Sequence, residues 1–300
     1  MGFSALLAAL LLEYFRPLRF RFRVYAWFNA YARLLERQFN AGEHRHGVLA
    51  WALGVVPLAL LVAVGGHLLG GLGSLPEWAW SVAILYLVMG FKQFSGSAAG
   101  IAASLRADAL DDARRQLGQW TGSDASSLSP TEVARRGIEE TLAGSYTQLF
   151  GVMIWFAVFG PGGAVLYRLA QILGRKWGRL DEREFGEFGV FAVRVQGWVE
   201  WLPLRLTAIS FAVMGDFEDA MYCWRSQAGQ WLQQGMGIVL ASGAGALGVK
   251  LGDAESGNEL GLGDVADADY LDSALSLVWR VLILWLVLLL LFGLARWTSS

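Results

Sequence analysis

The sequence is poor in charged residues and in cysteine, and it has no excess of basic residues. Only 17% of its 300 residues are charged and 55% are hydrophobic, whereas ordinary soluble domains carry about 25% charged residues. The single cysteine, Cys223, excludes an intramolecular disulfide framework and a cysteine-based zinc site. The formal net charge of −2 argues against nucleic acid as a partner, because nucleic-acid-binding domains usually have a strong basic excess. This composition is typical of a membrane protein.

Long apolar runs between polar blocks predict an all-α, polytopic integral membrane protein. A helix needs about 20 apolar residues to cross a bilayer, and residues 273–294 form such a run with one charge, Arg280. We predict one domain over residues 1–300, with membrane segments at about 3–14, 48–71, 77–92, 149–173, 198–214 and 273–294. The first is interpreted as a retained short membrane helix. The fourth contains a Gly-Pro-Gly-Gly sequence at residues 160–163, which predicts either a kinked span or a re-entrant pair of half-helices.

The arginines near the N-terminus predict the orientation. They are Arg16, Arg19, Arg21, Arg23, Arg33, Arg37 and Arg45. By the positive-inside rule this segment is cytoplasmic, and its interleaved aromatic residues favour an amphipathic helix lying on anionic headgroups. The hairpin of the second and third segments returns the chain to the cytoplasm, which predicts a cytoplasmic helical insert at about 93–146.

Local patterns refine this topology. Residues 98–120 have helical spacing, and Ser129, Pro130 and Glu132 form the start signal of another helix. The basic residues of block 175–187 would lie outside the cell if residues 149–173 crossed the membrane once. A re-entrant passage of that segment is therefore preferred.

Two loop patterns have competing interpretations. Residues 243–248 (GAGALG) match GxGxxG, but the surrounding chain offers no βαβ unit, so a glycine-lined segment packed closely against another helix is favoured over a nucleotide site. Residues 252–272 carry seven carboxylates and no basic residue. These oxygens could hold Mg²⁺, with Glu259 and Asp264 as candidate ligands, or they could form a solvated acidic loop.

Glu200 and Arg205 interrupt the apolar segment 198–214. Ionisable groups at membrane depth are costly and usually pair with one another or line a cavity. Their spacing of five residues makes direct pairing along one helix imperfect. One of them is therefore expected to face a ligand or another element.

Four stretches, in this order, resemble the CobD/CbiB family of cobalamin-biosynthesis membrane proteins and its relative, the AmpE family. They are Gly122 to Asp124 with Leu128 and Glu139 (the family's GRDT…L…E), residues 160–168 ending in Tyr167 and Arg168, residues 194–206 ending in LPLRL, and residues 245–252 (the family's GALGxxLG). The similarity covers nearly the whole chain.

The CobD/CbiB resemblance implies an inner-membrane amide synthase. Such an enzyme joins adenosylcobyric acid to an aminopropanol phosphate, with ATP and Mg²⁺, to give adenosylcobinamide phosphate. The resemblance implies catalytic roles for Glu139 and Asp124. It implies substrate-binding roles for Tyr167, Arg168, Arg194, Glu200, Arg205, Glu218, Gly245, Gly248 and Gly252. The expected partners are membrane lipids, a corrinoid or another small ligand, and a second copy of the chain if the protein is an oligomer.

The polar site departs from the family pattern. The family's Asn-Thr-x-Asp begins at Gln171, its paired aspartates begin at Gln196, and the asparagine that follows them falls at Glu200. Residues 201–206 (WLPLRL), and Glu218 with Trp224, resemble AmpE, a membrane protein tied to signalling in β-lactamase induction. The alternative function is therefore a non-catalytic, AmpE-like sensor. A transporter is a third interpretation that rests only on the broken fourth segment.

Overall fold

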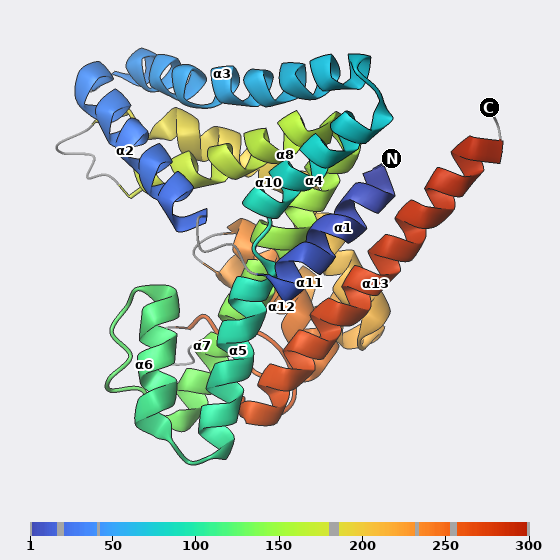
Figure 1. The fold of residues 1–300 in the computed structure, drawn as a ribbon. Helices are drawn as coiled ribbons and strands as arrows, with labels where there is room; N and C mark the ends of the chain where they lie inside the picture. The colour runs from blue at the N-terminus through green and yellow to red at the C-terminus, as the bar shows by residue number, and fades with distance from the viewer. Residues whose placement is uncertain are drawn as a thin grey trace. The chain divides into compact units, whose positions relative to one another are not determined.

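The computed structural model is all-helical (Figure 1), which confirms the predicted fold class. It describes residues 2–16, 21–40, 43–179, 186–231, 234–252 and 257–298. The helices are α1 (Gly2–Phe15), α2 (Arg21–Phe39), α3 (His44–Gly71), α4 (Ser74–Val88), α5 (Phe91–Arg106), α6 (Leu110–Thr121), α7 (Pro130–Ser145), the π-helical turn η1 (Tyr146–Phe150), α8 (Gly151–Trp177), α10 (Val190–Met214), α11 (Phe217–Gln227), the 3₁₀ turn η2 (Ala228–Gln230), α12 (Gln234–Leu247) and α13 (Ala268–Thr298). Within these ranges, β structure is limited to two isolated bridges, Val249 to Asp264 and Leu251 to Leu260.

Contacts divide the chain into two compact units. Unit 1 comprises Met1–Met89 and Gly151–Leu202, and unit 2 comprises Gly90–Phe150 and Pro203–Ser300. In unit 1, α3 packs on α8, and α4 packs on α1, α3 and α8. In unit 2, α11 packs on α12, and α5 contacts α6, α7 and α13. Each unit uses segments from both halves of the sequence. The prediction of one domain over the whole chain stays a prediction.

Four helical segments are long and apolar enough to cross a membrane. They are His44–Gly71, Ser74–Arg106, Pro130–Trp177 and Ala268–Ala295. They match four predicted segments, at 48–71, 77–92, 149–173 and 273–294. On α13 the exposed Ile283, Val287 and Leu291 follow one another at four-residue spacing, as a lipid-facing stripe requires. The chain is therefore a polytopic membrane protein.

The other two predicted segments form helices outside this set of four. α1 has 14 residues, fewer than the roughly 20 that span a bilayer. α10 is 25 residues long but carries Arg194, Glu200 and Arg205. Membrane crossing by residues 3–14 and 198–214 stays a prediction.

The predicted break in the fourth segment is present in α8. Gly160 has φ 64° and ψ −156°, outside the helical region, and Pro161 follows it. Proline removes a helical N–H donor and its ring crowds the preceding turn, so the helix axis changes direction here. Gly162 packs closely on α3, where an added Cβ would lie 2.7 Å from the Cβ of Ala63. Whether the segment crosses or re-enters stays a prediction.

One predicted helix is corrected. Residues 98–120 are not one helix: α5 ends at Arg106 and α6 begins at Leu110. The turn between them places Asp108 at φ 55°, a left-handed conformation that aspartate tolerates better than most residues, and Ala109 N–H bonds to the Ser104 carbonyl at 2.9 Å. The predicted membrane segment 77–92 lies within the apolar segment Ser74–Arg106, although Met89 is extended and α4 ends at Val88.

The predicted start signal of α7 is confirmed. The Glu132 N–H donates to Ser129 Oγ at 3.3 Å, and the Ser129 N–H donates to Glu132 Oε2 at 2.7 Å. This reciprocal capping box, with Pro130 at the first helical position, satisfies two otherwise unpaired backbone donors. The local sequence therefore determines where α7 begins, and so where its charged residues lie.

Candidate functional site

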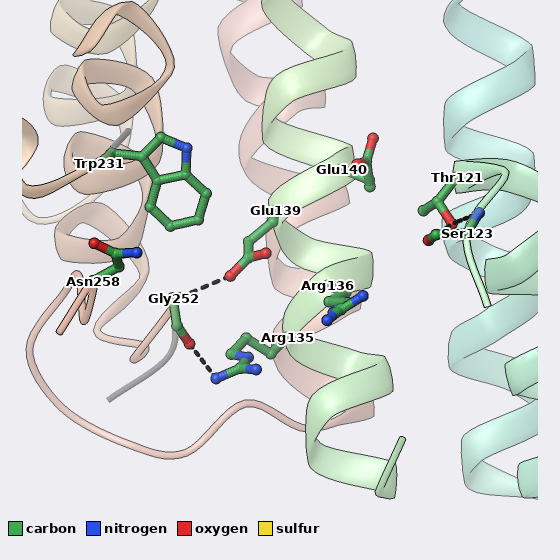
Figure 2. Close-up of a pocket in the computed structure, with 9 residues that line it drawn as sticks. All are labelled: Thr121, Ser123, Arg135, Arg136, Glu139, Glu140, Trp231, Gly252 and Asn258. Carbon is green, nitrogen blue, oxygen red and sulfur yellow. Dashed lines mark hydrogen bonds between the residues drawn. The ribbon is translucent and has the colours of Figure 1, made fainter. Parts of the chain in front are cut away.

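Unit 2 contains a polar pocket of about 340 Å³ beside α7. Its lining residues come from α7, the end of α6 and the segment after it, and the chain before and after α12 (Figure 2). They are Thr121, Ser123, Arg135, Arg136, Glu139, Glu140, Trp231, Gly252 and Asn258. This set includes two of the predicted site residues, Glu139 and Gly252.

The charged lining comes from one stretch of α7. Residues four apart on a helix are neighbours on its surface, so Arg135 lies one turn before Glu139 and Arg136 one turn before Glu140. Figure 2 shows Arg135 and Glu139 directed toward Gly252, with Arg136 and Glu140 on the side of α7 toward Thr121 and Ser123. The core face of the same helix is apolar, and there Val133, Ala134 and Ile138 are fully buried. The amphipathic pattern of α7 thus turns the charged residues toward the pocket.

Two side chains of α7 form hydrogen bonds to the backbone of Gly252. Its N–H donates to Glu139 Oε1 at 2.7 Å, and its carbonyl accepts from Arg135 Nη1. Gly252 has φ +76°, and an added Cβ would lie 1.9 Å from the Asn258 carbonyl oxygen. Only glycine fits this position, both for its backbone conformation and for space.

The Nε atom of Arg135 is buried and has no hydrogen-bond partner in the described part of the chain. Guanidinium groups form strong, often bidentate hydrogen bonds with phosphate and carboxylate oxygens. The pocket can therefore bind an anionic group, while its two carboxylates can bind a cation or accept a proton.

Unit 1 contains a second polar group, centred on Glu200 of α10. Glu200 is only 7% exposed, and its Oε1 accepts from Gln171 Nε2 of α8 at 2.9 Å and from Gln196 Nε2 at 3.0 Å. The sequence predicted that either Glu200 or Arg205 faces a ligand or another element, and in the structure Glu200 bonds to α8. Buried carboxylates are stable only when hydrogen-bonded or paired, and the two carboxamides supply those bonds.

The network extends along α8 to two further predicted residues. Gln171 Nε2 also donates to the hydroxyl of the buried Tyr167 at 3.1 Å, and Arg168 Nη1 donates to Gln171 Oε1 at 3.2 Å. The Arg168 guanidinium carbon lies 5.3 Å from the ring centroid of Tyr25 on α2, within the range of a cation–π contact. Tyr167, Arg168 and Glu200 are thus brought together through Gln171.

Other predicted residues lie outside these two groups. Asp124 is exposed after α6, where its carboxylate accepts from the Ser126 N–H at 2.9 Å, and this bond lowers the pKa of the Asp124 carboxyl. Arg194 on α10 and Glu218 on α11 are exposed, and Arg205 is half-buried in the part of α10 that belongs to unit 2. Roles for these four residues in binding or catalysis stay predictions.

The glycine motif at 243–248 packs helices together, as predicted. An added Cβ on Gly245 would lie 2.4 Å from the Asp219 carbonyl oxygen, so α12 approaches α11 at backbone distance. Gly248 has φ +67° and follows the last residue of α12. Glycine after a helix end commonly adopts this left-handed conformation. Gly245 and Gly248 shape the fold of unit 2.

Glu259 and Asp264, the candidate metal ligands, have protein partners. Glu259 Oε1 lies 3.4 Å from Lys250 Nζ, and Asp264 Oδ2 accepts from the Tyr270 hydroxyl at 2.9 Å. In the described ranges, no three His, Cys, Asp or Glu side chains gather as metal ligands. Asp253 and Glu255 of the acidic loop lie outside those ranges, as do Arg19 and Arg183.

Sequence reasoning missed Arg135, Arg136, Gln171 and Gln196 as site residues. For the arginines a signal existed, because an Arg-Arg pair stands one helical turn before a Glu-Glu pair in a segment with a clear helix start. The two glutamines were noted only as departures from the family pattern. In the structure both bond to Glu200, so three departures from that pattern form one hydrogen-bonded group.

Comparisons with known proteins agree on one family. The model of the family described as CobD/Cbib protein matches residues 5–278. The chain is 38% identical over 277 residues to the cobalamin biosynthesis protein CobD of Stutzerimonas stutzeri, with 89% of each chain covered. It is 35% identical over 244 residues to the protein of the same name from Chromobacterium violaceum, with 78% of each covered. No solved structure matches the chain. These findings give no support to the AmpE alternative.

Proposed function

The chain belongs to the CobD/CbiB family, and from this membership we propose that it is an amide synthase of cobalamin biosynthesis. The proposed reaction joins a carboxyl group of adenosylcobyric acid to the amine of an aminopropanol phosphate. The observation that carries the proposal is the pocket of unit 2, which is lined by two arginines and two glutamates of α7. Such a site can hold a phosphorylated amine and receive its proton.

The chemistry requires a neutral amine. The C–N bond forms when the amine lone pair attacks the activated carboxyl carbon, an oxygen leaves with the activating group, and the nitrogen releases its extra protons. A general base within reach of that nitrogen accelerates this step. We assign this role to Glu139, because its Oε1 accepts a hydrogen bond of 2.7 Å from the Gly252 N–H, and this bond fixes the carboxylate at the pocket wall.

ATP and Mg²⁺ are the proposed co-reactants: ATP would activate the carboxyl group, and Mg²⁺ would neutralise phosphate charge. Mg²⁺ is usually held by one or two carboxylates together with substrate phosphates and water. Glu139 and Glu140 of the lining would supply those carboxylates. Arg135 and Arg136 would bind phosphate oxygens there.

We propose the inner membrane as the location, with the pocket facing the cytoplasm. Four apolar helical segments are long enough to cross a bilayer, and the arginine-rich N-terminal segment favours a cytoplasmic position for the insert that includes α7. Water-soluble co-reactants such as ATP would then reach the pocket directly.

The Glu139→Gln variant tests this proposal. Glutamine keeps an oxygen that can accept from the Gly252 N–H but cannot take up a proton. We expect the rate of adenosylcobinamide phosphate formation to fall by about 10²- to 10⁴-fold, the usual contribution of a general base. The assay uses the purified full-length protein with adenosylcobyric acid, aminopropanol phosphate, ATP and Mg²⁺.

The matched control is Glu43→Gln, an exposed glutamate before α3 in unit 1 whose side chain caps no backbone group. Its rate should equal that of the wild type. An unchanged rate in Glu139→Gln would remove Glu139 from the reaction. Absence of product from well-folded wild-type protein would overturn the synthase proposal.

A further inference from the structure

The outward side of helix α2 in unit 1 is both basic and apolar. Its exposed residues include Arg23, Trp27, Arg33, Leu34 and Arg37, which together form the α2 face. We propose that the α2 face binds the anionic headgroups of a phospholipid membrane. This inference concerns how unit 1 meets the membrane surface, and it does not depend on the synthase reaction.

The two sides of α2 have different surroundings. Phe28, Ala32 and Leu35 follow one another at helical spacing and are buried, and α2 packs on α3 (Figure 1). At 3.6 residues per turn, the five residues of the α2 face lie within an arc of about 120° on the other side of the helix. The packing of unit 1 therefore turns these charged and apolar side chains outward together.

The charge of the α2 face is of one sign. The sequence of α2 contains a single acidic residue, Glu36. Its side chain is 15% exposed, and its Oε2 lies 2.9 Å from Nζ of Lys176 on α8, so this carboxylate is already paired within unit 1. The α2 face itself carries three arginines. Basic residues close to a membrane surface are attracted to anionic lipids, so the charge of this face is complementary to such a surface.

The apolar residues of the α2 face favour a lipid over a soluble anion or an acidic protein. Trp27 is 61% exposed and Leu34 is 49% exposed. Trp27 stacks on Tyr31 of the same helix, with ring centroids 5.9 Å apart. Tryptophan is enriched where membrane and water meet, and a helix that combines such residues with arginine typically lies at that boundary. A lipid uses both kinds of side chain, because its headgroup pairs with arginine and its acyl region covers tryptophan and leucine.

The contact with α3 places α2 near the membrane surface. α3 has 28 residues, a length of about 42 Å at 1.5 Å per residue, whereas the hydrocarbon core of a bilayer is about 30 Å thick. Because α3 begins with His44, Arg45 and His46, this end is the one that extends into the headgroup layer. The Tyr31 hydroxyl of α2 donates to the Leu53 carbonyl at 3.2 Å, about 14 Å along α3 from its start. The bond therefore holds α2 beside the polar end of α3.

A polarity-sensitive fluorophore on the α2 face tests the proposal. It is attached to Ala30→Cys in the full-length protein in detergent, because Ala30 is exposed on the same side of α2 and the native Cys223 is fully buried. The probes are dioctanoyl phosphatidylglycerol, dioctanoyl phosphatidylcholine, which has no net charge, and glycerol 3-phosphate, which has the anion without acyl chains. We expect phosphatidylglycerol to shift the emission to shorter wavelength at a concentration at least about tenfold lower than phosphatidylcholine, and glycerol 3-phosphate to cause no shift.

Variants of the labelled protein separate the charged from the apolar contribution. Arg33→Gln and Arg37→Gln should each weaken the affinity for phosphatidylglycerol about fivefold and leave the affinity for phosphatidylcholine unchanged, whereas Arg33→Lys should retain the parental affinity. Trp27→Ala should weaken the affinity for both lipids by a similar factor, because burial of an indole ring does not depend on headgroup charge. The matched control is Arg115→Gln, an exposed arginine on α6 in unit 2, and it should respond to each lipid as the parent does.

Salt provides an independent measurement, because raising the ionic strength from about 0.1 M to about 1 M shortens the Debye length from about 10 Å to about 3 Å. The response to phosphatidylglycerol should weaken under this change, and the response to phosphatidylcholine should not. Equal responses to the two lipids would overturn the proposal, and so would the parental affinity for phosphatidylglycerol in a variant that lacks both Arg33 and Arg37. A shift with glycerol 3-phosphate equal to that with phosphatidylglycerol would overturn it in favour of a soluble anion. No shift with either lipid would show that the α2 face meets water or another protein.

Discussion

At Gly252 a single residue connects the loop after α12 to the pocket. Its N–H and carbonyl bond to Glu139 and Arg135, and its left-handed φ of +76° and its contact with the Asn258 carbonyl leave no room for a side chain. The position of the proposed base therefore depends on a glycine that carries no chemistry itself.

Gly252→Ala should destabilise the protein more than Gly122→Ala does. Gly122 has nearly the same φ, +74°, but an added Cβ there meets open space. The alanine variant at position 122 should therefore lose only about 1–2 kcal/mol of stability, the cost of the left-handed conformation. At Gly252 a Cβ would lie 1.9 Å from the Asn258 oxygen, and the loop must move as well. Unfolding in detergent measures both variants, and equal losses of stability would contradict the steric argument.

At the scale of elements, α8 and the first part of α10 share a buried polar contact within unit 1. Glu200 on α10 accepts from Gln171 on α8, 29 positions earlier in the chain, and from Gln196 one turn before it. The added Cβ of Gly174 would lie 2.2 Å from Gln196 Oε1, so the two helices approach closely here. The hydrogen bonds thus hold α8 and α10 in register.

Glu200→Leu should destabilise this helix pair more than Glu200→Gln. Leucine removes the oxygen that accepts from the buried Gln171 and the part-buried Gln196, and a buried donor left without a partner costs about 1–3 kcal/mol. Glutamine keeps the side-chain length and one acceptor oxygen, so it serves as the matched control. Thermal unfolding in detergent provides the measurement, and a leucine variant as stable as the glutamine variant would show that the contact adds nothing to stability.

At the scale of the whole molecule, the two units are built from interleaved segments of one chain, and four apolar segments are long enough to cross a bilayer. The arginine-rich segment before α3 predicts which side of the membrane the insert occupies. A direct test of topology is practical because the chain has one cysteine.

Asp111→Cys, in a Cys223→Ser background, should react with a membrane-impermeant maleimide only from the cytoplasmic side. Asp111 lies on α6 with its side chain 94% exposed, so a cysteine there is accessible. In the parent protein, Cys223 is fully buried, and burial raises the pKa of its thiol to about 11, so little reactive thiolate exists at neutral pH. Labelling of Asp111→Cys in intact cells would contradict the predicted orientation.

The amino-acid sequence alone determined the properties that depend on neighbours along the chain. Apolar run length determined the membrane class and four of the apolar helical segments, and Ser129 and Glu132 determined the start of α7. Gly160 and Pro161 determined the break in α8. These features follow from helix periodicity, backbone dihedral preferences and hydropathy, all of which act over a few residues.

Tertiary structure decided which polar groups meet. Glu139 bonds to Gly252 across 113 positions, and Gln171 and Gln196 join Glu200, although the sequence marked those glutamines only as departures from a family pattern. It also divided residues 98–120 into two helices at Asp108. A hydrogen bond between distant residues depends on how whole helices pack, and packing depends on side-chain shapes throughout a unit. No local pattern in the sequence contains that information, so the pocket could be identified only from the tertiary structure.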